Sequence, residues 1–394
     1  NIGQSCFFDC QKLHTVEFSE DSKIEKIREY TFKGSVIQTI FIPKFVKIIE
    51  KHAFENCDNL RRVVFDDDSQ LEFIGQSSFA NTQIASVFIP KHVKTIDDGA
   101  FYSCNQLSDV LFSESNELIT IGKNSFGSTK LRNITIPKNV EIMDEEAFGY
   151  SKLNNISFEE PSKVQTIGFG TFCSTSIESL KLPSSIVSLS EGWCKFTPKL
   201  NEVIFPIPND RIKILDNKVI LEKSSQFFES GAKEKCFDVL LFAPRNLKSI
   251  KIPSTIKIIS QFAFSDCREL QSVTFEEDSQ LEEICNESFS FSSISYIRFP
   301  RNLKKICYAS FLNCKQLKQI EFDPESKVSI EIGAFVKSGL KGLIVPRFID
   351  KMKEFSFENC SKLHSIEFLG CDIDIVISPS MVQYISLYSF PSSF

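Results

Sequence analysis

The sequence predicts a solenoid, an elongated stack of about 15 short repeats that share a parallel β-sheet. Two markers support this prediction because they keep the same spacing. One is a proline in an Ile-Pro-like context, and the other is the leucine of an L-x-x-V/I-x-F pattern. Successive members of each series lie 46 or 47 residues apart, and each series has one gap of 70 residues. The prolines are Pro43, Pro90, Pro137, Pro183, Pro253, Pro300 and Pro346, and the leucines are Leu13, Leu60, Leu107, Leu153, Leu200, Leu270, Leu317 and Leu363.

An aromatic residue divides each 47-residue unit into a longer and a shorter repeat. The longer repeat reads LRRVVFDDDSQLEFIGQSSF over residues 60–79, and the shorter reads IASVFIPKHVKTIDDGAF over residues 84–101. The sequence contains 39 Phe but only one Trp and seven Tyr, so Phe is used repeatedly at one position of the repeat. The markers are Phe7, Phe32, Phe54, Phe79, Phe101, Phe126, Phe148, Phe172, Trp193, Phe264, Phe289, Phe311, Phe335, Phe357 and Phe390.

Each part of the repeat has an expected structure. The alternation in L-x-x-V-x-F places the Val and the Phe on one side of a short strand. Such a strand cannot stand alone, but stacking the same strand from every repeat builds a parallel sheet over a continuous interior. The proline after the strand removes a hydrogen-bond donor where the ladder should stop. The I/V-x-x-I-x-x-x-A/S-F segment then returns the chain along the opposite side, and its Phe fills the interior.

One continuous solenoid is expected, with an interruption. Residues 1–205 and 247–394 are assigned to repeats, and residues 206–246, where the markers skip, to a hairpin-like insertion. Two apolar runs within it, at 219–221 and 239–242, suggest its strands. The insertion is either a tolerated surface excursion or a protruding binding element. The last step, from Phe357 to Phe390, is 33 residues long, which indicates a degenerate terminal repeat.

Composition excludes some partners. The net charge of −6 and the pI of about 5.5 argue against non-specific binding to nucleic acid or to anionic membranes. No apolar run approaches the roughly 18 residues of a membrane span, and no signal peptide is visible. The chain begins at Asn1 inside a repeat, so we interpret it as a fragment.

The combined pattern IPxxVxxIxxxAFxxCxxLxxVxF resembles the BspA-like, or Treponema pallidum-type, branch of leucine-rich repeats. The resemblance covers almost the whole chain apart from residues 206–246. It implies a curved, right-handed leucine-rich-repeat solenoid with the short strands on the concave face. It also implies a surface antigen or adhesin that binds host matrix proteins or neighbouring cells. The sequence departs from ordinary leucine-rich repeats because a proline turn replaces their Asn ladder.

The 13 cysteines cannot all pair within the chain. Six of them lie three residues after a marker Phe and recur once per double repeat: Cys10, Cys57, Cys104, Cys267, Cys314 and Cys360. Strands two repeats apart are about 10 Å apart, too far for a disulfide, so these residues are expected to be reduced and buried. Cys173 with Cys194, and Cys285 with Cys307, occupy equivalent positions in successive repeats, and their disulfide state stays open.

No catalytic or metal site is expected. His14, His52, His92 and His364 lie at separated repeat positions, and no nucleophile elbow, phosphate-binding loop or H-E-x-x-H motif is present. Acidic clusters such as Asp66-Asp67-Asp68 follow the longer strand, and Lys44, Lys91 and Lys138 follow the proline of the shorter repeat. We interpret these charges as a solvated edge with weak ion pairs, with calcium binding as the alternative.

The outward column of the strands gives the candidate binding site. Between the inward Val and Phe, one side chain per repeat faces outward, and four successive repeats place Phe41, Val64, Phe88 and Leu111 side by side. Three strand spacings make this stripe about 14 Å long, and Arg62 and Asp109 lie beside it. The stripe is either a hydrophobic ligand patch, a β-propensity filler without a partner, or a self-association contact.

The sequence thus predicts a non-catalytic recognition or adhesion module without a cofactor. It would bind a protein, for example a host or extracellular-matrix protein, or a glycan through the concave face. The resemblance implies a cell-surface or secreted location. The alternative is an intracellular scaffold or regulator of protein–protein interactions, in the cytoplasm, which the unpaired cysteines would suit. No membrane span within residues 1–394 and no nucleic-acid partner are expected.

Overall fold

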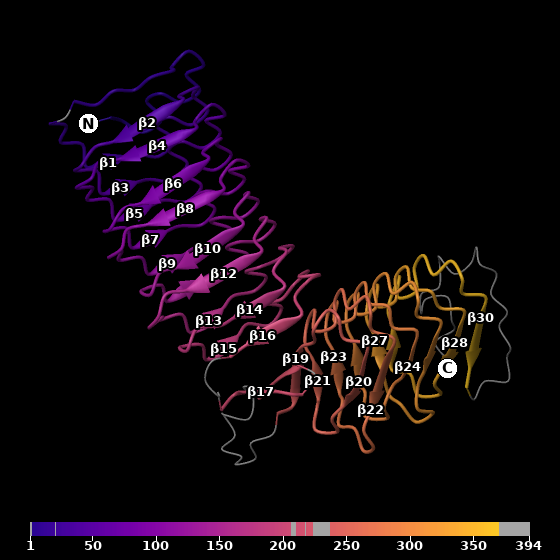
Figure 1. The fold of residues 1–394 in the computed structure, drawn as a ribbon. Helices are drawn as coiled ribbons and strands as arrows, with labels where there is room; N and C mark the ends of the chain where they lie inside the picture. Colours follow the sequence, from indigo (N-terminus) through magenta and orange to yellow (C-terminus); the bar gives the residue numbers. More distant parts are fainter. Residues whose placement is uncertain (1, 20, 206–209, 217, 224–236, 370–394) are drawn as a thin grey trace. The chain divides into compact units, whose positions relative to one another are not determined.

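The computed structural model describes residues 2–19, 21–205, 210–216, 218–223 and 237–369. The chain divides into two compact units, Asn1–Thr197 with Val203–Ile207 (unit 1) and Pro198–Glu202 with Pro208–Phe394 (unit 2). Each unit is a stack of successive turns (Figure 1). The described residues form strands and turns without any helix, so none of them supplies a helix that could span a membrane. The predicted leucine-rich-repeat solenoid with stacked parallel strands is confirmed.

One column of strands comes from the L-x-x-V/I-x-F pattern and its counterpart in the shorter repeat. In unit 1 these strands are β2 (Thr39–Ile42), β4 (Arg62–Phe65), β6 (Ser86–Ile89), β8 (Asp109–Phe112), β10 (Asn133–Ile136), β12 (Asn155–Phe158) and β14 (Ser179–Lys181), with β16 (Glu202–Ile204) at the division between the units. In unit 2 they are β20 (Ser249–Ile252), β22 (Ser272–Phe275), β24 (Tyr296–Arg298), β26 (Gln319–Glu321), β28 (Gly342–Val345) and β30 (Ser365–Phe368). We call this column the long-strand face. The hydrogen-bonded pairs within it are parallel and in register, such as β2 with β4 and β6 with β8.

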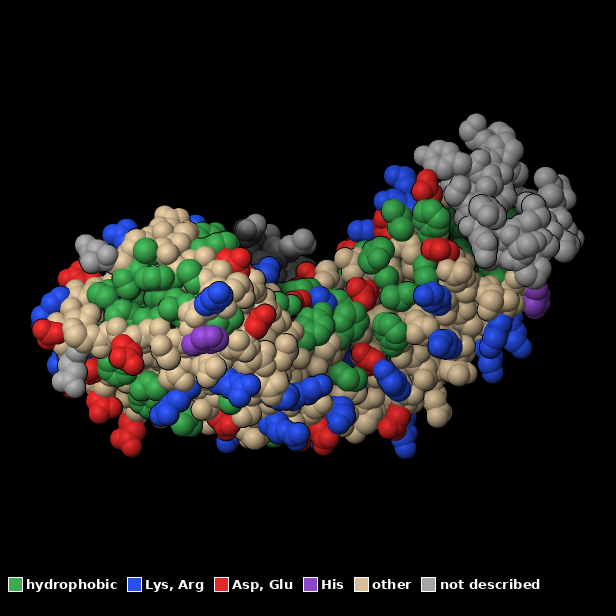
Figure 2. All heavy atoms as spheres, turned by 90° about the horizontal axis from the view of Figure 1, so that it is seen from above, with side chains coloured by type: hydrophobic (Ala, Val, Ile, Leu, Met, Phe, Trp, Pro, Cys, Tyr) green, Lys and Arg blue, Asp and Glu red, His purple; other side chains and the backbone are tan. Residues whose placement is uncertain are grey.

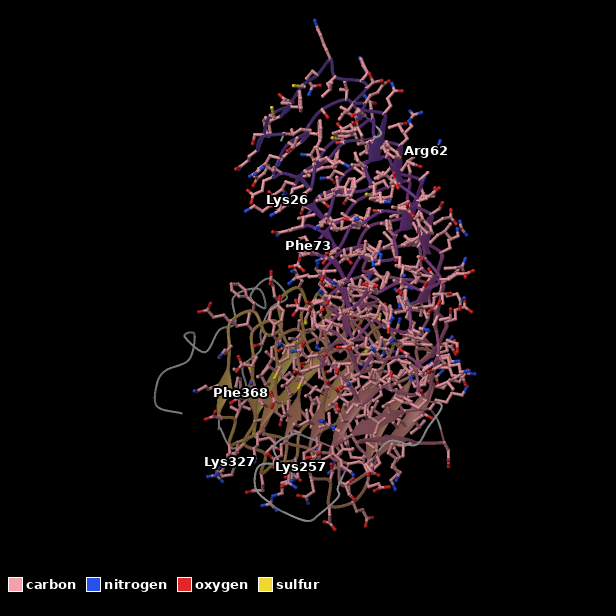
Figure 3. The ribbon with its side chains drawn as sticks, turned by 90° about the vertical axis from the view of Figure 1, so that its left-hand side faces the viewer. Lys26, Arg62, Phe73, Lys257, Lys327 and Phe368 are labelled. Carbon is pink, nitrogen blue, oxygen red and sulfur yellow. The ribbon has the colours of Figure 1, made fainter. Side chains whose placement is uncertain are left out.

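A second column of two-residue strands lies in the return segments, where the sequence did not predict strands. In unit 1 it consists of β1 (Lys26–Ile27), β3 (Ile48–Ile49), β5 (Phe73–Ile74), β7 (Thr95–Ile96), β9 (Thr120–Ile121), β11 (Ile142–Met143), β13 (Thr166–Ile167) and β15 (Ser188–Leu189). In unit 2 it includes β21 (Ile258–Ile259), β23 (Glu283–Ile284), β25 (Lys305–Ile306), β27 (Ser329–Ile330) and β29 (Lys351–Met352). These short strands form a continuous parallel sheet in each unit. Figure 3 shows Arg62 of β4 on one side of unit 1 and Lys26 of β1 with Phe73 of β5 on the other, so the two columns face opposite ways.

The marker aromatics fill the space between the two columns. Phe54, for example, is fully buried, and its ring stacks on Phe32 at 5.2 Å and on Phe79 at 5.1 Å between centroids. The same stacking continues from Phe7 to Phe172 in unit 1 and from Phe264 to Phe357 in unit 2. The excess of Phe in the sequence therefore reflects one aromatic column per unit, as the sequence predicted.

A third ladder of hydrogen bonds runs beside the aromatic column. In the turn of Phe54, the backbone N–H groups of His52, Phe54 and Asn56 donate to carbonyl oxygens of the following turn, at 2.7–2.9 Å. His52 and Asn56 have φ of 58° and 57°, in the left-handed region. Alternating right- and left-handed residues turn successive N–H groups to the same side, which explains why all three donors point toward the next turn. The equivalent donors of other turns point the same way, so this ladder has one direction along the stack.

The segment assigned to an insertion contributes strands to unit 2. β17 (Ile212–Ile214) and β18 (Ile220–Glu222) form an antiparallel hairpin, and β18 pairs antiparallel with β19 (Val239–Phe242). β19 then pairs parallel with β21 and begins the short-strand column of this unit. Residues 206–209, 217 and 224–236 of the segment, and residues 370–394 with the expected terminal repeat at Phe390, lie outside the described residues.

Candidate functional site

The four apolar residues of the predicted stripe lie on neighbouring strands of the long-strand face. Phe41 on β2 is in register with Val64 on β4, and Phe88 on β6 is in register with Leu111 on β8. The side chains on either side of them along each strand point into the core: Ile40 and Ile42 beside Phe41 are both fully buried. Phe41, Phe88 and Leu111 are 38%, 51% and 60% exposed, and Val64 is half-buried. The strand alternation thus presents an apolar column to solvent, which we call the apolar stripe.

Polar side chains border the apolar stripe along one flank. Arg62 and Asp109 are exposed and begin β4 and β8, where they are in register with Thr39 and Ser86. Asp109 accepts a hydrogen bond from the hydroxyl of Ser108 at 2.6 Å. Within the described residues, Arg62 has no carboxylate partner, so its guanidinium can pair with a group on a ligand.

The apolar stripe also ends at polar residues along the stack. Beyond Leu111 the next two outward positions are Thr135 on β10 and Ser157 on β12, and their hydroxyls hydrogen-bond to each other at 2.9 Å. Before Phe41 the outward position is the exposed Glu17. The stripe is therefore a bounded apolar patch with a polar rim, the usual form of a contact surface.

Other exposed apolar residues were not anticipated from the sequence. On the short-strand column of unit 1, Ile142 is 50% exposed and Val187, next to β15, is 43% exposed. The two-residue strands at these positions are too short to give an alternating pattern in the sequence. Figure 2, which shows one face of the molecule, has apolar side chains gathered in patches between charged ones of both signs.

Five of the six cysteines that lie three residues after a marker Phe are buried, as expected, and we call them the thiol column. The sixth, Cys10, is half-exposed. The Sγ of Cys104 donates to the carbonyl oxygen of Phe79 at 3.1 Å, and that of Cys314 to Phe289 at 3.0 Å. Burial raises the pKa of Cys104 to about 11 and that of Cys314 to about 12. These thiols stay protonated at neutral pH, so they serve packing and hydrogen bonding rather than reaction.

The two cysteine pairs whose state was open are thiols in the structure. Cys307 donates from Sγ to a carboxylate oxygen of Glu283 at 3.0 Å, and Lys305 binds the same oxygen at 3.3 Å. Burial, followed by the hydrogen bond to Glu283, raises the pKa of Cys307 to about 12. A thiol with this pKa is a poor nucleophile at neutral pH.

The acidic turns interact with the preceding turn of the stack. Asp68 binds Lys44 between Oδ2 and Nζ at 2.8 Å, and this ion pair lowers the pKa of the Asp68 carboxyl. Glu276 accepts from the backbone N–H of Ser254 at 2.9 Å. No group of three or more His, Cys, Asp or Glu residues able to hold a metal occurs in the part of the chain that the structure describes. The calcium alternative therefore gains no support from these turns.

The histidines contact carboxylates that the sequence spacing did not reveal. His52 lies 2.9 Å from Glu55 and stacks on Tyr30 with 4.9 Å between ring centroids, and His92 lies 3.1 Å from Glu117. Each of these contacts joins a histidine to a carboxylate. Among the described residues, no nucleophilic side chain hydrogen-bonds to either histidine. The arrangement can form ion pairs between turns but provides no triad.

Comparison with known proteins identifies the type of repeat. Residues 1–108, 100–219 and 238–364 match the family model described as BspA type Leucine rich repeat region, in six copies. A leucine-rich repeat protein from Eubacterium ventriosum is 21% identical with a TM-score of 0.60, over 72% of this chain and 73% of that chain. A leucine rich cell surface protein from Faecalibacterium prausnitzii is 20% identical with a TM-score of 0.57, over 88% of this chain and 83% of that chain. At these identities the likeness concerns the fold alone. The curated proteins include no sequence match to the chain.

Proposed function

The chain belongs to the BspA-type leucine-rich-repeat family, and on that premise we propose that it is a non-catalytic recognition module of the cell surface that binds a protein ligand through the apolar stripe. The observation that carries the proposal is the exposure of Phe41, Phe88 and Leu111 on one column of register-paired strands. Strand alternation requires these side chains to face outward, but it does not require them to be apolar. The equivalent column of unit 2 carries Lys251, Thr274 and Arg298 instead.

The backbone under the apolar stripe supports binding by preorganised side chains. Each strand of the stripe is held by inter-turn hydrogen bonds, and the residues on either side of the outward one are buried in β2, β4 and β6 and half-buried in β8. Little conformational entropy is then lost when a partner binds. Buried aromatic anchors inside a polar rim are the usual hot spots of protein interfaces. Phe41 and Phe88 would be the anchors, and Arg62 and Asp109 would set the orientation of the partner.

Substitution of the two anchors tests the proposal. The double variant Phe41→Ser/Phe88→Ser is compared with the wild-type chain for binding to immobilised fibronectin, laminin and type I collagen by surface plasmon resonance. A matched control is Ile142→Ser/Val187→Ser, which removes two exposed apolar side chains of the same unit from the short-strand column. We expect saturable binding of the wild-type chain to at least one probe and a loss of about tenfold or more in the anchor variant. The control should bind within about twofold of the wild type.

Three results would contradict the proposal. The first is that the wild-type chain binds none of the three probes. The second is equal binding by the anchor variant and the wild type. The third is an equal loss in the anchor variant and the control, because that loss would arise from overall hydrophobicity. Thermal melting of both variants shows whether any loss comes from unfolding, which the outward positions of all four residues make unexpected.

The thiol column favours a second candidate, an intracellular scaffold with the same binding face. The geometry of Cys104 and Cys314 needs a reduced sulfur that donates to a Phe carbonyl, and thiols persist best in a reducing compartment. Thiol titration of the natively purified protein, unfolded in urea without reductant, separates the two. A count of 13 thiols favours the scaffold, and a lower count favours the surface module.

A further inference from the structure

A hollow of about 610 Å³ in unit 2 brings three lysines together. Lys315, Lys337 and Lys362 line it, and we call it the basic pocket. The other lining residues are Phe291, Leu312, Asn313, Ser338, Gly339, Asn359 and Ser361. This pocket belongs to unit 2, whereas the apolar stripe belongs to unit 1. None of its three lysines was a candidate binding residue on sequence grounds.

The stacking of the turns brings the three lysines together. Each follows a different marker, Phe311, Phe335 and Phe357, whose ring centroids are 5.0 and 5.1 Å apart along the stack. The ammonium groups therefore come from three neighbouring turns and can contact an extended ligand along the stack. Gly339 allows two of these turns to pack closely, because a Cβ there would lie 2.2 Å from the carbonyl oxygen of Lys315.

The three lysines also differ from other lysines of unit 2 in their surroundings. Lys304, Lys305 and Lys353 contact carboxylates at 2.8, 3.3 and 2.6 Å. Among the described residues, no carboxylate contacts the lysines of the basic pocket. No acidic residue lines the pocket, although the amide of the lining Asn359 donates to Glu358 at 3.2 Å.

The repeat does not fix a positive charge at the position of Lys315. The position four residues after the marker is Lys315 in the turn of Phe311, but it is Asp58, Asn105 and Arg268 in three other longer repeats. Arg268 binds Asp266 at 3.0 Å, so its charge is compensated. The basic pocket is therefore a local cluster of lysines without carboxylate partners among the described residues, on a chain with a net charge of −6, and such a cluster attracts anionic ligands.

From this geometry we propose that the basic pocket binds an acidic oligosaccharide, one whose sugar units carry sulfate or carboxylate groups. The three ammonium groups pair with the acidic groups on successive sugars. The Asn313 amide and the Ser361 hydroxyl are in place to hydrogen-bond sugar hydroxyls between them. A phosphopeptide fits less well, because no arginine lines the pocket to bind its phosphate in the bidentate way.

Charge-matched variants of the full chain test the proposal. Lys315→Gln/Lys337→Gln/Lys362→Gln is compared with Lys304→Gln/Lys327→Gln/Lys353→Gln, which removes the same charge from positions of unit 2 that do not line the basic pocket. Figure 3 labels Lys327. The probe is a size-defined heparin oligosaccharide, measured by isothermal titration calorimetry, with uncharged dextran oligosaccharide as the negative probe. We expect the wild-type chain to bind heparin and not dextran, and its affinity to fall with added salt. The pocket variant should lose at least about tenfold in affinity, and the control variant should stay within about twofold.

Several outcomes would overturn the proposal. These are no heparin binding at low salt, an equal loss in both triple variants, and equal binding of dextran. Tighter binding of a single-stranded oligonucleotide or of a phosphopeptide in the same pocket would assign it to that other class. Exposed Lys→Gln substitutions are expected to leave the melting temperature unchanged. If the melting temperature of the triple pocket variant does change, the double variant Lys337→Gln/Lys362→Gln takes its place. The same binding results then support or overturn the proposal. The apolar-stripe variants leave this pocket intact, so the two proposals fail separately.

Discussion

Replacement of Phe54 by alanine tests the packing of the stack directly. Phe54 is fully buried and stacks on a ring on each side, Phe32 and Phe79. Truncation of a buried Phe costs about 3–5 kcal/mol, and each lost aromatic pair contributes about 0.5–1.5 kcal/mol beyond its area. Because these terms involve the same atoms, we expect the upper part of the range, about 4–5 kcal/mol. Phe88→Ala removes a side chain that is 51% exposed, so its expected cost is roughly 1 kcal/mol.

The assay is urea unfolding of the wild type and the two variants at 25 °C, followed by circular dichroism. A solenoid is stabilised between nearest neighbours, so loss at Phe54 can also split the transition and lower its slope. The comparison therefore uses the free energy of the transition that involves unit 1. If Phe88→Ala costs as much as Phe54→Ala, the inward and outward sides of the stack are wrongly assigned. A cost below about 2 kcal/mol for Phe54→Ala would instead mean that neighbouring rings close the cavity.

Three further outcomes are expected. Because burial raises the pKa of Cys104 to about 11, its native thiol keeps a proton that the unfolded chain loses above about pH 9. The free energy of unfolding should then fall by about 1.4 kcal/mol per pH unit between about pH 9 and 11 because of this thiol. When this free energy is measured by urea unfolding at several pH values, Cys104→Ala should make its fall with pH less steep. An equal dependence on pH in the variant and the wild type would contradict the raised pKa. Ser125→Ala should stabilise the chain by about 1 kcal/mol and so raise its melting temperature, because the described residues provide no partner for the buried hydroxyl. Ala53 occupies the equivalent position of another repeat, so alanine fits there. A lower melting temperature would mean that the hydroxyl makes a hydrogen bond. Burial raises the pKa of Glu222 to about 7, so the stability gained from its protonation is lost as the pH rises from about 4.5 through 7. Glu222→Gln should therefore narrow the difference in melting temperature between pH 5 and pH 8, and a wider difference would refute this.

The periodic residues made much of the fold predictable. A marker such as Phe54 recurs at a nearly constant step, and only a stack in register places every such ring in one column. The two-residue strands were missed because Ile48–Ile49 is too short to show a period of two. The left-handed residues were missed for another reason. Tyr30 and His52 have positive φ, although glycine and asparagine are the residues that signal this conformation. Tertiary hydrogen bonds impose it there, and single-sequence patterns do not report such bonds.

The two candidate surfaces differ in how far the sequence reveals them. Phe41 and Phe88 face outward because strand alternation is a local rule, which the sequence displays directly. The basic pocket depends on three residues that are 22 and 25 positions apart, Lys315, Lys337 and Lys362. Each is an ordinary exposed lysine in its own repeat. Only the register of the stack brings them to one hollow, so the pocket could not be found before the position of each turn was known.

The direction of the third ladder determines which backbone groups face the start of the stack in unit 2. Each turn directs N–H groups forward and carbonyl oxygens backward, so partial charges add along the column as they do in a helix. At the first full turn of unit 2, the ladder oxygen of Ala263 accepts from the backbone N–H of Ala243 at 2.9 Å and from the guanidinium of Arg245 at 2.9 Å. Arg245 also donates to the carbonyl oxygen of Phe262, which lies outside the ladder, at 3.3 Å. Arg245 is only 3% exposed, and a buried charge is stable only when such partners surround it. Arg245 therefore adds a cationic donor to the backbone donor of Ala243 at the start of this ladder. From this turn onward the marker rings stack in one column, from Phe264 to Phe357.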